Sequence, residues 1–238
     1  MAWEDITDQH RRTTLGPLWL LVNYLLFIGA FVLVFGDRST DYDHAAYMAV
    51  GLFVWIHVAE VLNQGVTLFI REEGFIKGTP LPLPVYVMRT TMQILMRESF
   101  TLAGCLIFLL FSHVEWQPVM MAALPGILAI VVATPPAVLL VAMFGAWFPD
   151  SQFIVANLVR VGMFLTPIFW LASAGSGLRQ LLASLNPFTH VIALVRDPVV
   201  FGAFHPHGLV AAALVCVGLW MLAIAGLALV RRKIIFWL

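Results

Sequence analysis

Ionisable side chains inside apolar stretches are the residues of this chain that could do chemistry. Three stand out: Glu60, His57 one helical turn before it, and Arg160. A lone charge in the middle of a membrane costs at least about 2.5–3.5 kcal/mol, so such groups pair with each other or face a wet cavity. Counted from the ends of their apolar runs, Glu60 and Arg160 fall at similar depth. We therefore predict an intramembrane Glu60–Arg160 pair, within one protomer or across a dimer. The alternative is that Arg160 alone faces a water-filled path.

Motifs for catalysis or metal binding are missing from the sequence. It contains no GxxxxGK[ST], HExxH, CxxC or GxSxG pattern. His205 and His207 form an isolated HxH, which is a weak metal signal. Cys105 and Cys216 lie in apolar runs, where cysteine acts as a small hydrophobic residue. We therefore expect no catalytic residue, no metal site and no enzyme activity in this chain, and the sparse intramembrane charge also disfavours a proton-driven transporter.

Composition places the chain in a membrane. It is 61% hydrophobic and 11% charged, with a mean hydropathy of +0.94, whereas soluble domains carry about 25% charged residues. The formal net charge is zero, which gives no electrostatic case for nucleic-acid binding.

Apolar runs long enough to cross the hydrocarbon, about 20 residues, predict an all-α membrane protein with one transmembrane domain over residues 1–238. We expect six spans: Leu15–Phe35, Ala45–Ile70, Gln93–Phe111, Val119–Phe148, Gln152–Ala172 and Gly208–Val230. Pro125 and Pro135-Pro136 are expected to kink the fourth span, and Pro167 to break the fifth. Residues 3–14 are polar with scattered apolar positions, Trp3 and Ile6, and predict a short interfacial helix.

The segment Gln64–Ser99 interrupts this apolar pattern. It contains the charged turn Arg71-Glu72-Glu73, a glycine-bordered piece Gly74–Gly78, and alternate prolines at Pro80-Leu81-Pro82-Leu83-Pro84. Because proline lacks an N–H and keeps the preceding residue extended, no helix is expected across the prolines. The segment predicts a short charged helix or turn, a stiff linker and a polar lead-in. It could dock on a soluble partner or be an ordinary cytoplasmic loop.

Residues 173–207 contain two short helical patterns, Leu178–Leu185 and Pro187–Arg196. Asn186 followed by Pro187 is a favourable helix start, because asparagine caps the backbone and proline suits the first turn. Neither helix can cross a bilayer. They could form a re-entrant hairpin or lie on the surface.

Basic residues indicate the orientation, since cytoplasmic loops carry an excess of Lys and Arg. With both termini inside, the inner segments hold nine basic residues and the outer segments three. The nine are Arg11, Arg12, Arg71, Lys77, Arg89, Arg97, Arg231, Arg232 and Lys233, and the three are Arg38, Arg179 and Arg196. This places both termini and Gln64–Ser99 in the cytoplasm and the short helices outside.

Five stretches, in order along the chain, resemble the membrane subunit of ABC transporters that export polysaccharides such as O-antigen, capsule or teichoic chains. They are RRTTLGPLW from Arg11 to Trp19, Asn63-Gln64-Gly65 with the later Leu81-Pro82, FLTPIFW from Phe164 to Trp170, Asn186-Pro187-Phe188 through Arg196, and the basic, aromatic ending from Arg231 to Leu238. Each stretch alone is weak, and all five together are specific.

The resemblance implies a homodimer in the bacterial inner membrane, bound to two copies of a separately encoded ATPase that holds ATP and magnesium. It implies transport of a lipid-linked glycan from the cytoplasmic side, as in lipopolysaccharide biosynthesis. A coupling helix between the second and third spans would then be formed by Arg71, Glu72, Glu73, Phe75 and Lys77.

The same resemblance implies an exit gate in the outer hairpin and a path between protomers. The gate residues would be Leu182, Asn186, Pro187, Val191 and Arg196. Aromatic candidates to line the path are Trp19, Phe164, Phe169 and Trp170, because ring faces stack on sugars. The alternative is that these aromatics form the interfacial belt.

Two other functions remain open. A permease of the same fold could carry a drug or a lipid. A membrane-embedded transferase acting on lipid carriers would need an aspartate cluster or an Asp/His/Arg set at a membrane face, which this sequence lacks.

Overall fold

The computed structural model describes residues 15–35, 43–78, 81–171, 177–230 and 234–237. These residues form helices, turns and short connections, with no strand in the described ranges. The interfacial helix predicted for residues 3–14 lies outside them.

Within the described ranges, five helices are long and apolar enough to cross a membrane, and they match five of the six predicted spans. They are α2 (Leu18–Phe35), α3 (His44–Arg71), α5 (Leu83–Leu110), η1 and α6 together (Pro118–Ala122 and Ala123–Trp147), and α10 (Pro206–Val230). The chain is thus a multi-pass, all-helical membrane protein.

The third span begins ten residues earlier than the sequence predicts. We expected a helical, polar lead-in after Pro84 and a span from about Gln93, whereas α5 is one continuous helix from Leu83, immediately after Pro82. Pro84 stands in the first turn of the helix, where the missing N–H costs nothing because that group has no helical partner. The extended linker is correspondingly shorter.

The predicted fifth span is only partly helical. α7 (Ser151–Leu165) has 15 residues, about 22 Å at 1.5 Å per residue, which is less than the roughly 30 Å of hydrocarbon. It ends just before Pro167, as the proline predicts. Two short helices follow, α8 (Leu178–Leu185) and α9 (Pro187–Val200). The helix start predicted at Asn186-Pro187 is present, with the Phe188 N–H donating to the Asn186 side chain at 3.0 Å.

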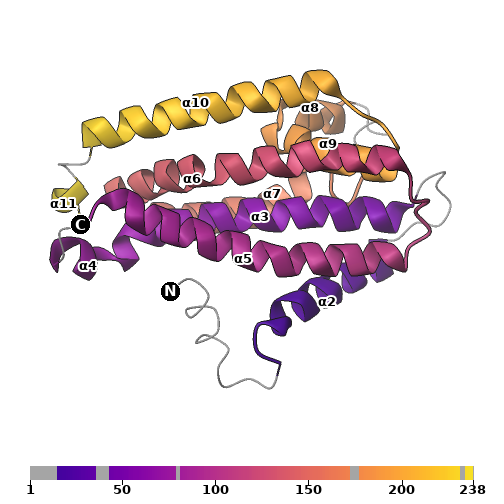
Figure 1. The fold of residues 1–238 in the computed structure, drawn as a ribbon, viewed down its shortest axis with the longest axis horizontal. Helices are drawn as coiled ribbons and strands as arrows, with labels where there is room; N and C mark the ends of the chain where they lie inside the picture. The colour runs from indigo at the N-terminus through magenta and orange to yellow at the C-terminus, as the bar shows by residue number, and fades with distance from the viewer. Residues whose placement is uncertain (1–14, 36–42, 79–80, 172–176, 231–233, 238) are drawn as a thin grey trace.

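α3 is the central helix of the bundle and packs against α2, α5, α6, α7 and α9 (Figure 1). In its apolar window 67% of residues are buried, compared with 11% in α2 and 6% in α10. α2 and α10 lie along opposite edges of the bundle and present apolar side chains outward. The short helices α4 (Glu73–Gly78) and α11 (Ile234–Trp237) lie together at one end of the bundle.

The close packing of α3 on α6 depends on glycine. A Cβ built on Gly145 would overlap the backbone carbonyl of Val66, and one on Gly65 would meet Val141 at 3.3 Å. Small residues let helix backbones approach closely in membranes, where dispersion contacts replace the hydrophobic effect as the force between helices.

Gly145→Ala is therefore expected to force α3 and α6 apart and to lower the thermal midpoint of the purified protein, since overpacking costs about 1–3 kcal/mol. Gly218→Ala in α10 is the matched control, because a methyl group added at that position would meet nothing within 4 Å. Equal midpoints for both variants in one detergent would contradict the packing described here.

Candidate functional site

α4 presents a small charged and aromatic surface at one end of the bundle. Ile76 is buried and belongs to the apolar cluster that contains Phe69 and Tyr86, which anchors the helix. Phe75 is 65% exposed. Lys77 Nζ and Glu73 Oε1 are 2.7 Å apart across one turn, both in solvent. The anchored helix thus holds an exposed aromatic ring beside an ion pair.

Glu72 faces the bundle instead, and Arg71 lies exposed beside it. The Glu72 side chain is 14% exposed and lies 3.5 Å from Arg71 Nε and 4.0 Å from Arg89 Nη1. Arg71 also donates to the Gln64 side chain at 2.9 Å. Of the five predicted coupling residues, two therefore fasten the end of α3 to α5, and Glu73, Phe75 and Lys77 point outward.

An aromatic cluster lies at the opposite end, between α2 and the segment after α7. Phe169 stacks on Phe31 with ring centroids 4.3 Å apart and on Phe35 at 5.5 Å. Phe164 contacts Phe169 at 5.9 Å, and Trp170 Nε1 donates to the Phe164 carbonyl at 3.2 Å. The structure thus brings together three of the four predicted path aromatics.

α2 contributes a row of rings that the sequence analysis missed. Phe27, Phe31 and Phe35 recur every four residues and therefore share one face of the helix. Phe27 and Phe31 meet edge to face at 4.8 Å, and Phe35 stacks on Phe31 at 5.9 Å. We call this row and Phe169 the aromatic ladder. Trp19 stands twelve residues before Phe31, about 18 Å along the helix, and does not join it.

The outer hairpin is bound to the chain break after α7. Arg196 is 3% exposed, donates through Nη1 to the Pro167 carbonyl at 2.8 Å, and lies 4.0 Å above the Tyr47 ring. The Tyr47 hydroxyl donates to the carbonyls of Pro167 and Trp170, each at 3.1 Å. The predicted gate residue Arg196 and the predicted path segment Phe164–Trp170 are therefore joined by hydrogen bonds.

The tip of the hairpin reaches deep into the bundle. Asn186 Nδ2 donates to Thr166 Oγ1 at 2.8 Å, and Phe188 packs against Trp55 at 5.6 Å. Trp55 lies eleven residues along α3 from His44, about 16 Å. Leu182 and Val191 are half-buried and Pro187 is exposed. A gating role for these residues stays a prediction.

The predicted Glu60–Arg160 pair is wrong within one protomer. Glu60 Oε2 instead lies 3.3 Å from Arg97 Nη1. Because α5 begins at Leu83 and runs antiparallel to α3, Arg97 falls at the depth of Glu60, whereas we had placed it near the cytoplasmic end. Arg160 is exposed on α7 and has no ion-pair partner in the described part of the chain.

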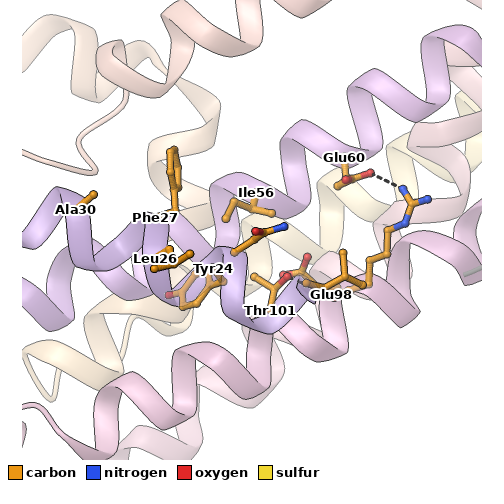
Figure 2. A pocket seen from close by; sticks show the side chains of 11 residues that line it. Tyr24, Leu26, Phe27, Ala30, Ile56, Glu60, Glu98 and Thr101 are labelled. Atoms are coloured by element: carbon orange, nitrogen blue, oxygen red, sulfur yellow. Dashed lines mark hydrogen bonds and ion pairs between the residues drawn. The ribbon is translucent and has the colours of Figure 1, made fainter. Parts of the chain in front are cut away.

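A second buried polar group lies beside this pair. His57 Nε2 is 2.9 Å from Thr134 Oγ1, and His57 Nδ1 is 3.7 Å from Glu98 Oε2. Glu60, Arg97 and Glu98 also line a pocket of about 500 Å³ between α2, α3 and α5 (Figure 2). Sequence reasoning missed Arg97 and Glu98 because the third span was started too late.

Comparison with known proteins gives one informative relative. The chain is 24% identical over 198 residues to the O-antigen export system permease protein RfbA of Myxococcus xanthus, covering 81% of this chain and 75% of that protein. No protein-family model matches the chain. The resemblance to a polysaccharide-exporting ABC permease, drawn above from five motifs, is confirmed by this similarity.

The Glu60–Arg97 pair predicts a charge-swap rescue. Glu60→Gln or Arg97→Gln should each lower the amount of folded protein in the membrane, since an unpaired charge at this depth costs about 2.5–3.5 kcal/mol. The double change Glu60→Arg with Arg97→Glu should recover part of it, measured by fluorescence-detected size exclusion. Arg160→Gln is the control and should behave like the parent. A swap no better than the single changes would rule out the pair.

The Arg196 contacts predict a stability loss that charge alone does not explain. Arg196→Lys keeps the charge but lacks the planar group that reaches Pro167 and covers the Tyr47 ring. We expect a loss of about 1.5–3 kcal/mol, the usual value of a charged hydrogen bond, seen as a lower thermal midpoint. Arg160→Lys, which is exposed, should leave the midpoint unchanged. Equal midpoints for both variants would show that the hairpin is not held in this way.

Proposed function

We propose that this chain is the transmembrane subunit of an ATP-driven exporter that moves a lipid-linked, O-antigen-like polysaccharide from the cytoplasmic side across the bacterial inner membrane. The observation that carries the proposal is the similarity over 81% of the chain to an O-antigen export permease. Three of the five motifs lie at the segment between α3 and α5, at the chain break after α7 and at the hairpin, which are the places where a transporter of this kind would need them.

The proposed topology has six crossings with both termini in the cytoplasm. α7 and residues 166–171 would make the fifth crossing together, with the hairpin of α8 and α9 filling the outer half of the bilayer as a re-entrant element. The packing of Phe188 on Trp55 supports this depth. Irregular backbone at such depth is tolerated only against protein or a cavity. Here the Pro167 carbonyl accepts hydrogen bonds from Tyr47 and Arg196, and Asn186 donates to the Thr166 hydroxyl.

ATP hydrolysis belongs to a partner in this proposal. The chain has no phosphate-binding loop, so ATP and magnesium would be held by two copies of an ATPase subunit. α4 would dock into that partner through Phe75, Glu73 and Lys77, while Arg71 and Glu72 would pass the movement to α3 and α5. The fixed position of Ile76 in the apolar core supports a rigid connection.

The glycan would pass along the aromatic ladder, between this chain and a second copy. Phe27 and Phe35 are 41% and 44% exposed and offer apolar surfaces for sugars, while Phe31 holds the row against Phe169. Their helix is scarcely buried in one chain, which leaves that surface available to a partner copy. Leu182 and Val191 would line the exit as its gate.

Deletion of the gene tests the function directly. The deletion strain should lose surface polysaccharide and accumulate lipid-linked glycan inside, and a tagged permease should co-purify with an ATP-hydrolysing subunit. Normal surface glycan in the deletion strain would refute the proposal and favour a drug or lipid substrate.

If α4 docks on the ATPase through Phe75, a change at Phe75 should impair export without impairing insertion of the permease in the membrane. Phe75→Ala should reduce export at least tenfold and weaken co-purification of the ATPase, because exposed aromatic anchors dominate interface energy, while the permease remains in the membrane. Phe111→Ala is the matched control, since Phe111 is 85% exposed at the opposite end of the bundle. Full export by Phe75→Ala would show that α4 does not couple the two subunits.

A further inference from the structure

The pocket between α2, α3 and α5 is lined by apolar side chains and by three ionisable ones. Its volume of about 500 Å³ falls in the roughly 300–1,000 Å³ range of small-molecule sites. Its lining includes Leu26 and Phe27 of α2, Glu60 of α3 and Glu98 of α5 (Figure 2), together with Arg97 of α5. The pocket adjoins the first ring of the aromatic ladder, because Phe27 belongs to both.

Two buried polar atoms at or beside the pocket have no hydrogen-bond partner among the described residues. Glu98 Oε1 is buried and has no hydrogen-bond partner among the described residues, and the same is true of His57 Nδ1 beside it. The Glu98 side chain is only 12% exposed. An unsatisfied buried group costs about 1–3 kcal/mol, and a charged one more. A ligand that donates hydrogen bonds to Glu98 would remove this cost.

α2 supplies a further polar group at the mouth of the pocket. Asn23 is the one amide side chain in this apolar helix. It is exposed, lines the pocket, and has no hydrogen-bond partner in the ranges that the structure describes. Two unsatisfied groups from different helices, Asn23 and Glu98, therefore converge on one space.

The charges define the class of ligand. Two carboxylates repel an anion, and Arg97 is already paired with Glu60. No group of three His, Cys, Asp or Glu side chains that could hold a metal occurs among the described residues. A neutral, hydroxyl-rich compound satisfies the free acceptors without adding charge, and its apolar face can lie against an aromatic ring.

We propose that this pocket is a sugar-binding subsite, in which Glu98 and Glu60 accept hydrogen bonds from ring hydroxyls, Asn23 binds a further hydroxyl, and Phe27 covers the apolar face of the ring. The inference rests on the proposed function and deepens it, since it names a neutral sugar ring as the part of the substrate that is held midway across the membrane. From this subsite the ring would move onto the aromatic ladder.

Photolabelling of the full-length permease tests the subsite without requiring export. The protein is placed in nanodiscs of pure phosphatidylcholine, which contain no sugar-bearing lipid. The probe is an octyl β-glucoside with a diazirine in its alkyl chain, and the control probe carries the same chain on a triethylene glycol head. Labelled residues are identified by mass spectrometry, with and without excess methyl β-glucoside as soluble competitor.

We expect the glucoside probe to label α2 between Leu20 and Ala30 and α5 near Thr101, in competition with methyl glucoside, and the glycol probe not to. Glu98→Gln should lower labelling below saturation roughly fivefold to tenfold, because the amide replaces one acceptor oxygen by a donor and so loses a hydrogen bond worth about 1 kcal/mol. Asn23→Leu, on an exposed face, should also lower it. Glu115→Gln, an exposed carboxylate outside this pocket, is the control and should not.

Three results would overturn the subsite. Equal labelling by both probes would show that the pocket binds the alkyl chain of the probe and does not recognise the sugar. Unchanged labelling in Glu98→Gln would show that this carboxyl group does not bind the sugar. A loss of export in the same variant would then be due to a role in proton binding or in stability. Should Glu98→Gln fail to fold, unchanged labelling in Asn23→Leu decides against the subsite in its place. None of these results tests the proposed export function. That function would be refuted separately, by normal surface glycan in the deletion strain.

Discussion

The structure depends on how the carbonyl of Pro167 is satisfied. Where a helix stops inside a membrane protein, its freed backbone groups must be hydrogen-bonded by the protein itself. Tyr47 from the start of α3 and Arg196 from α9 both donate to this carbonyl. Arg196 tolerates full burial because Pro167, Asp197 and the Tyr47 ring share its charge. The end of α7, the central helix and the hairpin are consequently held as one unit.

The same requirement explains the middle of the bundle. Glu60 and Arg97 neutralise each other between α3 and α5, and His57 joins α3 to α6 through Thr134. Gly145 then lets the α6 backbone lie against Val66 of α3. Polar contacts thus fix which helices are neighbours, and glycine fixes how close they come. At the edges, α2 is joined to α3 by the Tyr24 hydroxyl, which donates to the Ala49 carbonyl, and α10 is joined to α6 by Trp220 Nε1, which donates to the Val132 carbonyl.

Sequence alone predicted the spanning helices well, because a run of about 20 apolar residues has few other uses, and it predicted the capped start of α9 from Asn186-Pro187. It predicted helix after Pro84, close to the observed start of α5 at Leu83, but it placed the start of the span at about Gln93 because of the polar residues between them. The wrong prediction of Arg160 as the partner of Glu60 followed from that error, because the residue that faces Glu60 depends on the register between α3 and α5. The row Phe27, Phe31 and Phe35 was visible as a four-residue repeat, whereas its contact with Phe169 required the fold.

A sugar chain crossing the membrane needs sites that bind it weakly and repeatedly, because a single tight site would stop the movement. Carboxylates alone would hold hydroxyl groups too firmly, and aromatic rings alone would not draw them out of water. The pocket at Glu98 and the ladder from Phe27 to Phe35 place both kinds of contact in sequence along α2. Only 11% of the apolar window of α2 is buried within the chain, so lipid would close the path on one side unless a second copy does. Lipid tails offer sugars no hydrogen bonds. In the proposed function, transport along α2 would therefore need a second copy, which would complete the path that the pocket at Glu98 and the aromatic ladder begin.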